Sequence, residues 1–214
     1  RTVLFVSHNM SAILRLTEES LVIDHGKLIK RAPSTDAVDF YLSRGLSQEG
    51  QRSWTDEDFS GSDPDFRPLS IKLLNPTGQV SDSLRSVEPI VIEISYRIKR
   101  DITGLRVGIY LLTPRGEYVL TSFDTDNTDT YEKLTTRKPG MYTSRCTIPA
   151  NLLNEGRYVV GVNASVFRIK RYFHDEQALS FSVDGSGAPG KQWPELRLGT
   201  VRPLLDWEIE GIEW

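Results

Sequence analysis

Apolar and polar residues alternate along most of the chain after Leu69, which is the spacing of half-buried β-strands. In the clearest run, every second residue from Ile90 to Ile98 is apolar or aromatic, and most of the residues between them are polar. Similar runs predict strands near residues 69–74, 105–111, 117–123, 142–148, 158–166 and 179–183. This part of the chain has no long stretch with helical spacing. The pattern therefore predicts a mainly β fold, an antiparallel β-sandwich.

Turns and breaks divide the runs. Pro114-Arg115-Gly116 separates two of them, so residues 105–123 are expected to form a hairpin. After the last run, residues 184–190 are rich in glycine, and the apolar pattern resumes in residues 199–207. A strand on such a tether can pair with its own sheet or with the sheet of a second copy. The residues leave both arrangements open.

The first 68 residues have a different pattern. Val3 to Val6 form a continuous apolar run, as in a strand buried on both faces of a parallel sheet. Ser7-His8 follows, and Asn9 stands where a helix N-cap would stand. Residues 43–68 are polar and rich in glycine and acidic residues, which indicates an interdomain linker or a disordered tether.

Composition narrows the possible functions. The chain has 214 residues, of which 38% are hydrophobic and 26% are charged, and this composition excludes wholesale disorder. A net charge of −3 argues against a general nucleic-acid-binding protein. No apolar run approaches the roughly 18 residues that a membrane span needs. The single cysteine, Cys146, excludes an intramolecular disulfide and a cysteine-built metal site.

The motifs at the start of the chain closely resemble the end of an ABC transporter ATPase domain. The match covers residues 2–10, the helix through Glu19, and residues 21–28 with their Gly-Lys turn. Residues 33–41 look like the helix that follows in polysaccharide-exporting members. This resemblance implies that His8 is the switch histidine of a parent ATPase that uses ATP and magnesium.

The catalytic parts of such an ATPase are missing from the sequence. There is no G-x-x-x-x-G-K-[ST] phosphate loop and no apolar strand that ends in an acidic pair. We therefore expect a fragment of a longer polypeptide, without ATPase activity or a cofactor of its own. Its expected parts are an α/β ATPase remnant (1–44), a linker (45–68) and a β-sandwich (69–214) that includes a C-terminal strand (199–210).

Several short sequence motifs in the β region resemble those of the C-terminal domain of the ATPase subunit of O-antigen ABC exporters, the Wzt type. They lie in residues 124–128, at Gly140, and in residues 153–158, 181–183 and 199–207. This resemblance implies an immunoglobulin-like or jelly-roll sandwich that binds the exported glycan. It also implies a homodimer with exchanged strands, located in the cytoplasm at the inner face of the bacterial inner membrane. The parent ATPase would connect it to the membrane-spanning exporter subunit.

Catalysis in the β region has weak support from the sequence. Asp124 and Asp126 form a carboxylate pair, but their Thr, Asp and Asn neighbours favour a solvated loop over acid–base chemistry. His174 is interpreted as a surface-loop histidine. The remaining histidines, His8 and His25, have no metal-ligand spacing with it.

A sugar-binding surface is better supported. A hexose offers an apolar face and a ring of hydroxyl groups, so its site combines exposed aromatic rings with amide, carboxylate or guanidinium groups. Arg106 and Tyr110 flank Gly108, and Asn163 follows Gly161; glycines at outward positions are expected to admit a ligand. We predict a carbohydrate-binding patch of Arg106, Tyr110, Arg145 and Asn163. An ordinary solvated sheet face is the alternative.

A short basic cluster, Arg168, Lys170 and Arg171, is interleaved with aromatic residues. It is interpreted as a solvated loop or as a surface that docks on the ATPase domain, in preference to a nucleic-acid or lipid-headgroup patch.

These observations predict a non-catalytic module that binds an O-antigen or related polysaccharide, at its modified terminal end, and couples recognition to export. The alternative is a protein-interaction or dimerisation module that regulates the ATPase without binding sugar. A concave sheet face with clustered aromatic and polar residues would favour the first. A flat apolar patch near Trp54 and Trp193 would favour the second.

Overall fold

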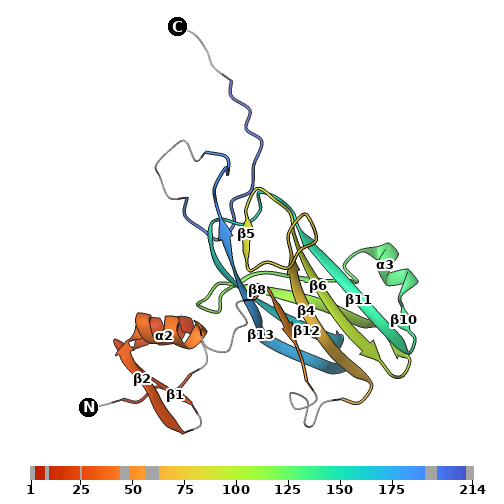
Figure 1. Ribbon diagram of the computed structural model, residues 1–214, viewed down its shortest axis with the longest axis horizontal. Helices are drawn as coiled ribbons and strands as arrows, with labels where there is room; N and C mark the ends of the chain where they lie inside the picture. Colours follow the sequence, from red (N-terminus) through yellow and green to blue (C-terminus); the bar gives the residue numbers. More distant parts are fainter. Residues whose placement is uncertain are drawn as a thin grey trace.

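The computed structural model describes residues 3–7, 10–24, 26–43, 49–55, 63–190 and 197–210. Residues up to 43 form a small α/β unit, with α1 (Met10–Leu16), β1 (Glu19–Asp24), β2 (Lys27–Pro33) and α2 (Ser34–Ser43) (Figure 1). β1 and β2 pair antiparallel, and Gly26 between them has a φ of 76°, which glycine adopts without strain. The predicted hairpin and the helix after it are therefore formed. None of the described helices is long and apolar enough to span a membrane.

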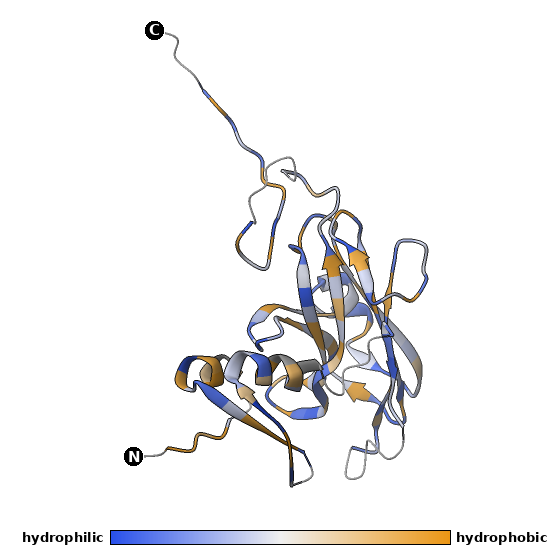
Figure 2. Ribbon diagram, turned by 60° about the vertical axis from the view of Figure 1, so that its left-hand side comes forward, coloured by the Kyte–Doolittle hydropathy of each residue, from blue (hydrophilic) through white to orange (hydrophobic). Residues whose placement is uncertain are grey.

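The predicted strand at Val3 to Val6 is not formed. Residues 3–7 have no regular secondary structure, and the exposed fractions of Val3, Leu4 and Val6 are 83%, 86% and 95%. Figure 2 shows these apolar residues on an extended stretch at the N-terminal end. A strand of this type needs hydrogen-bonded neighbours on both sides, and no described segment pairs with it. His8 and the expected N-cap Asn9 lie outside the described residues.

Two packed β-sheets make up most of the remaining chain (Figure 1). A four-stranded sheet has the order β11-β6-β4-β3, and a five-stranded sheet has the order β5-β13-β12-β8-β9. In the described pairings, β5 runs parallel to β13 and all other neighbours are antiparallel, which confirms the predicted mainly β sandwich. The strands are β3 (Gln51–Ser53), β4 (Phe66–Leu74), β5 (Ser83–Arg85), β6 (Ile90–Ile98), β8 (Leu105–Leu112), β9 (Tyr118–Phe123), β11 (Gly140–Ile148), β12 (Gly156–Val166) and β13 (Lys170–Asp184).

The core lies between the two sheets and uses the apolar positions of the alternating pattern. Ile92 and Ile94 of β6, Val107 and Ile109 of β8, and Val160 of β12 are at most 2% exposed. Burial of one such side chain contributes about 1.5–3 kcal/mol. The same alternation that predicts the strands therefore holds the two sheets together.

Short elements close one edge of the sandwich. β7 (Ile102–Thr103) pairs with β10 (Thr136–Arg137), and α3 (Thr128–Lys133) precedes β10. α3 begins after Asn127, whose side chain accepts a hydrogen bond from the Thr130 amide, and none of its residues is buried.

The segment expected to be a linker, residues 45–68, is not wholly a linker. β3 pairs with β4, and β4 begins at Phe66, which is 2% exposed. Trp54 is 6% exposed, and its indole nitrogen donates to Asp175 Oδ2 at 3.2 Å. An edge strand as short as β3 contains too few residues to reveal a period in the sequence.

β13 is longer than the predicted strand at 179–183, because it begins at Lys170. His174 and most of the basic cluster therefore lie in a strand and not in a loop. The register explains the difference: Val160 pairs with Leu179, but Val162 pairs with Asp175. Extra residues bulge from β13 at this point and interrupt the alternation.

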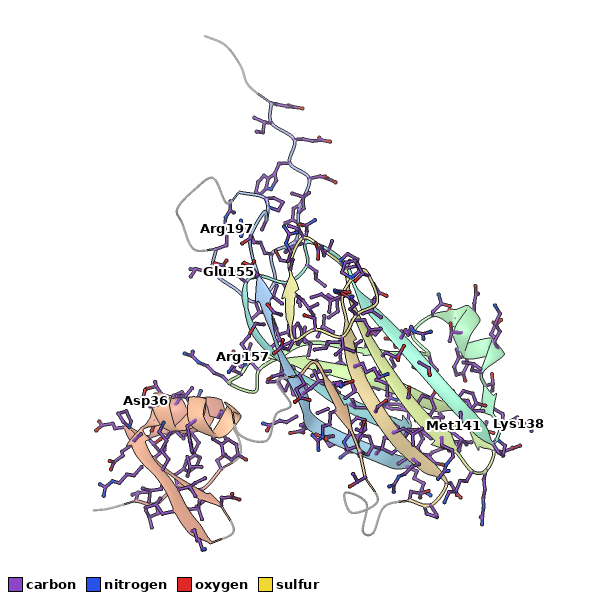
Figure 3. All side chains as sticks on the ribbon, in the orientation of Figure 1. Asp36, Lys138, Met141, Glu155, Arg157 and Arg197 are labelled. Carbon is purple, nitrogen blue, oxygen red and sulfur yellow. The ribbon has the colours of Figure 1, made fainter. Side chains whose placement is uncertain are left out.

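The C-terminal segment leaves the sandwich after a short contact. Leu153 and Val201 form an isolated antiparallel bridge, and Asn154 Nδ2 donates to the carbonyl oxygens of Arg197 and Gly199 at 2.7 and 2.9 Å. Figure 3 shows Arg197 and Glu155 at the end of the sandwich from which the segment extends. Residues 202–210 form no strand, so an edge strand on the chain's own sheet is not formed there.

Candidate functional site

Three of the four residues predicted to bind carbohydrate lie together on the outer face of the five-stranded sheet. β8 supplies Arg106 and Tyr110, and the neighbouring β12 supplies Asn163. Arg106 lies opposite Ser165, and Asn163 lies opposite Gly108 in the register of these strands. The three predicted residues line one hollow with a volume of about 320 Å³. The alternation of apolar and polar residues predicted that these three side chains lie on an outer sheet face. The strand order makes them neighbours on that face.

The fourth predicted residue, Arg145, does not belong to this hollow. It lies on β11 in the four-stranded sheet, opposite Glu93. Its Nε and Nη2 atoms are each 2.8 Å from Glu93 Oε2. Grouping it with the other three was wrong, because the alternation identifies outward positions but not the sheet to which each strand belongs.

The guanidinium group of Arg106 is held between two aromatic rings. Its Cζ atom lies 4.2 Å from the ring centroid of Phe123 and 4.9 Å from that of Phe167, and its Nε donates to Ser165 Oγ at 3.3 Å. Each cation–π contact of this kind contributes about 0.5–2 kcal/mol. The Nη groups make no hydrogen bond to a described residue, so they remain available to a ligand.

Gly108 and Gly161 make room for the protein's own chain and not for a ligand. A Cβ atom on Gly108 would lie 2.5 Å from the ring of Phe123, and one on Gly161 would lie 2.9 Å from the backbone of β13. The prediction that these glycines admit a ligand was therefore wrong. Gly108 still serves the site, because it lets Phe123 occupy the position in which its ring supports Arg106.

Tyr110 is the centre of a small aromatic group. Its ring centroid lies 5.6 Å from that of Tyr118 and 5.7 Å from that of His174, both edge-on. His174 Nδ1 is 3.5 Å from Asn163 Nδ2, and His174 Nε2 is 3.1 Å from Glu176 Oε1. A neutral imidazole protonated on Nε2 satisfies both contacts. His174 therefore orients side chains of the hollow, in contrast to the surface-loop role expected for it.

The turn between β12 and β13 adds residues that the sequence analysis did not assign to the site. Residues 166–171 close one side of the hollow. Arg168 at this turn has a φ of 58°, a conformation that is uncommon outside Gly, Asn and Asp, and its Cζ lies 5.0 Å from the Phe167 ring centroid. The basic cluster with interleaved aromatic residues was the available signal. The sequence does not reveal that this turn folds beside Arg106.

Comparison with known proteins identifies the family. The profile of the Wzt C-terminal domain matches residues 66–192, more than half of the chain. The chain belongs to this family. Solved structures with a similar fold include a crystal structure of the C-terminal domain of Wzt, at 11% sequence identity and a TM-score of 0.54. That match covers 80% of this chain and 95% of the other, and at this identity it shows the shared fold alone. No curated protein matches the chain.

Membership of the Wzt C-terminal domain family confirms the resemblance to the C-terminal domain of an ABC exporter. It also fits the expectation that this chain is not the catalytic ATPase region. The family match begins at Phe66, at the start of β4. The strand β3 and Trp54 precede the matched residues and pack onto them, β3 through β4 and Trp54 through Phe173.

In this Wzt C-terminal domain, Asp124 has a structural role. Its Oδ2 accepts hydrogen bonds from Arg137 Nη2 at 2.8 Å and from Ser144 Oγ at 2.9 Å, and its Oδ1 accepts one from the Val107 amide at 3.0 Å. Arg137 has no exposed surface and also donates to the Tyr96 hydroxyl. Because Val107 belongs to one sheet and Tyr96 and Ser144 to the other, this network joins the two sheets.

The other candidate groups also contribute to local structure. Asp126 Oδ2 accepts a hydrogen bond from the Phe123 amide at 2.8 Å. Cys146 packs against the core, and burial raises the pKa of its thiol. Among the described residues, no group of three or more His, Cys, Asp or Glu side chains is placed to hold a metal ion. The sequence has no phosphate loop to fit ATP and magnesium, so no step through them is assigned to this chain.

Proposed function

We propose that this Wzt C-terminal domain is a non-catalytic module that binds the exported O-antigen or a related polysaccharide and couples its recognition to export. The observation that carries the proposal is the hollow on the five-stranded sheet. There an aromatic ring, an amide, a hydroxyl and guanidinium groups converge on one space of about 320 Å³.

The groups that line the hollow suit a sugar. The Tyr110 ring offers an apolar surface beside polar groups, which matches the two sides of a hexose. Asn163 and Ser165 are only 3% and 7% exposed, and Ser165 Oγ donates to Asn163 Oδ1 at 2.8 Å, so both are fixed before a ligand arrives. The volume is near the lower limit of ligand pockets, about 300–1,000 Å³. It suits the end of a glycan chain better than a long stretch.

The rival proposal, a protein-interaction module without sugar binding, has less support. It would be favoured by a flat apolar patch near Trp54 and Trp193. Trp54 is 6% exposed and packs edge-on against Phe173, with ring centroids 5.1 Å apart. Trp193 lies outside the described residues. The burial of Trp54 therefore removes one of the two residues that would have formed the apolar patch.

Dimerisation through residues 199–210 is part of the same proposal. Leu204, Leu205, Trp207 and Ile209 are 67%, 61%, 83% and 91% exposed, which is unfavourable unless another surface covers them. The start of the segment is fixed, because the Tyr158 hydroxyl donates to the Thr200 carbonyl at 2.7 Å. Exchange of the remainder onto a second copy would cover these side chains.

Light scattering tests the dimer. The whole chain is expected to be a dimer, and a chain truncated before Gly199 is expected to be a monomer or to aggregate. A well-behaved monomer of the untruncated chain contradicts strand exchange.

The cellular setting follows from the proposed role. The domain would act in the cytoplasm at the inner face of the inner membrane, where the parent ATPase, with its ATP and magnesium, connects it to the membrane-spanning exporter subunit. The proposed partners are the glycan, a second copy of the chain and that subunit, and no nucleic acid.

Calorimetric titration with polysaccharide isolated from the source organism tests glycan binding. The whole chain is expected to bind it without hydrolysing it, and Asn163→Ala is expected to weaken binding because it removes a fixed amide from the floor of the hollow. Folded protein that binds neither this polysaccharide nor any member of a glycan array contradicts the proposal.

A further inference from the structure

The hollow has an unusual charge for this chain. Four of the residues that line it are cationic: Arg106, Arg168, Lys170 and Arg171. None of the lining residues is Asp or Glu. The chain as a whole has a net charge of −3. The positive charge of the hollow is therefore local and does not reflect the composition of the chain.

Nearby carboxylates neutralise only one of these four cations. Asp63 forms an ion pair with Lys170, Asp175 pairs with Arg52 at 3.2 Å, and Glu176 contacts His174. Arg106, Arg168 and Arg171 have no carboxylate partner among the residues that the structure describes. Three guanidinium groups thus face one hollow without a counter-charge.

Arg106 is also oriented in advance. The rings of Phe123 and Phe167 lie within 5 Å of its Cζ atom, and the hydrogen bond from its Nε to Ser165 Oγ further restricts the side chain. Its two Nη groups form a planar fork, the geometry that binds a carboxylate or a phosphate through two parallel hydrogen bonds. A neutral hydroxyl would use only part of this fork.

The turn that carries Arg168 supports the same conclusion. Its φ of 58° is unfavourable for arginine, whereas glycine or asparagine would adopt it more readily. The long side chain lies over Phe167 at the rim of the hollow. The turn, which is closed by a hydrogen bond from the Ile169 amide to the Val166 carbonyl at 3.1 Å, requires this conformation and places a cation at the rim.

We propose that the hollow binds a negatively charged sugar, whose charge is a carboxylate or a phosphate ester, with Arg106 as the main contact and Arg168 and Arg171 as supporting cations. This inference rests on the proposed glycan-binding function and specifies its ligand class. The ring of the sugar would lie towards Tyr110 and Asn163, and its anionic group would lie towards the turn.

Calorimetric titration of the whole chain with matched probes tests this proposal. The probes are a glucuronate-terminated oligosaccharide, its carboxyl-reduced glucose counterpart, and a hexose 6-phosphate. At least one acidic probe is expected to bind about tenfold more tightly than the neutral probe, as one charge-assisted hydrogen bond would give. Added salt is expected to weaken only the acidic complex. Comparison of the uronate with the phosphate identifies which anion is bound.

Variants connect the effect to these residues. Arg106→Gln is expected to reduce the preference for the acidic probe to about twofold or less. Arg171→Gln is expected to reduce it by a smaller factor, and this exposed residue keeps the test valid if loss of the Arg106 stacking impairs folding. Arg157→Gln, at the other end of β12, is the matched control and is expected to retain the full preference (Figure 3).

The contrary outcomes are distinct. Equal affinity for the acidic and neutral probes overturns the charged ligand but leaves the proposed function intact. Binding to none of the probes or array glycans overturns both. Binding to phosphatidylglycerol vesicles without binding to any sugar also overturns both, and it would make the hollow a lipid-headgroup site.

Discussion

The outer faces of the two sheets differ in how their polar side chains are partnered. On the four-stranded sheet, partners lie directly across the strands: Arg145 Nε is 2.8 Å from Glu93 Oε2, and Ser95 Oγ is 3.3 Å from Thr143 Oγ1. On the five-stranded sheet, Arg106 packs between aromatic rings and has no carboxylate partner among the described residues. On the first face Arg145 is paired within the sheet, whereas on the second the Nη donors of Arg106 are available to a ligand.

The same contrast separates two arginines. Arg137 is fully buried and bonded to Asp124 and Tyr96, so its charge is used within the fold. Arg106 is partly exposed, and its Nη groups are unpartnered within the described chain. Arg137 therefore supports stability, whereas Arg106 has donors available at the hollow.

The largest effect is expected for Arg137→Met. This change leaves the Asp124 carboxylate without its buried partner, which costs about 3–5 kcal/mol of the free energy of unfolding. Urea denaturation measures the loss, and Arg97→Met on the outer face of β6 is the control, with an expected change of about 0.5 kcal/mol or less. Equal losses for both variants would contradict the structural role of the Arg137 network.

Tyr110→Ala is expected to have the next largest effect, on binding. Loss of the aromatic ring should weaken binding of the isolated polysaccharide about tenfold, the size of a moderate hot spot. Titration calorimetry measures the change. Tyr131→Ala removes a half-exposed tyrosine from α3 and is expected to leave the affinity unaltered.

Arg145→Ala is expected to have a small effect, although the sequence alone placed this residue in the patch. Its ion pair with Glu93 lies at the surface, so the loss of stability should be below about 1 kcal/mol. Affinity for the polysaccharide should stay within about twofold of the parent value, because the residue makes no contact with the hollow. A tenfold loss of affinity would transfer the binding site to the four-stranded sheet.

The smallest expected effect concerns the pH dependence of the Asp63–Lys170 pair. Burial of Asp63 acts to raise the pKa of its carboxyl, but the hydrogen bonds from Lys170 and the Asp65 amide outweigh burial and lower the pKa. A carboxyl with a lowered folded pKa stabilises the fold above its ordinary pKa and loses this contribution as the pH falls through the lowered value. Asp63→Asn should therefore be slightly less stable than the parent at pH 7, and the difference should shrink near about pH 3. A difference that grows in acid would contradict this sign.

Alternation predicted the strands because the core is built from every second residue of each strand. It failed where short or irregular elements break the period. β3 is too short, and the bulge of β13 opposite Gly161 shifts the residues before it out of phase. The run Val3 to Val6 has the composition of a buried strand, but the pairing partners that would bury it are not among the described residues.

The candidate site was predictable in part for the same reason. Arg106, Tyr110 and Asn163 occupy outward positions of regular strands, and these strands turn out to be neighbours. Phe167 and Arg168 reach the hollow from a turn, and Phe123 contacts Arg106 from a strand end, where no period indicates the direction of a side chain. Their contribution depends on tertiary contacts that alternation does not encode.

Mapping of backbone amide chemical shifts during a titration with the isolated polysaccharide tests the central claim most directly. The account predicts that amides of β8, β12 and the turn at residues 166–170 shift together and saturate, while those of β6 and β11 remain unchanged. Shifts concentrated on β6 and β11 around Glu93 and Arg145, with the hollow unaffected, would contradict it.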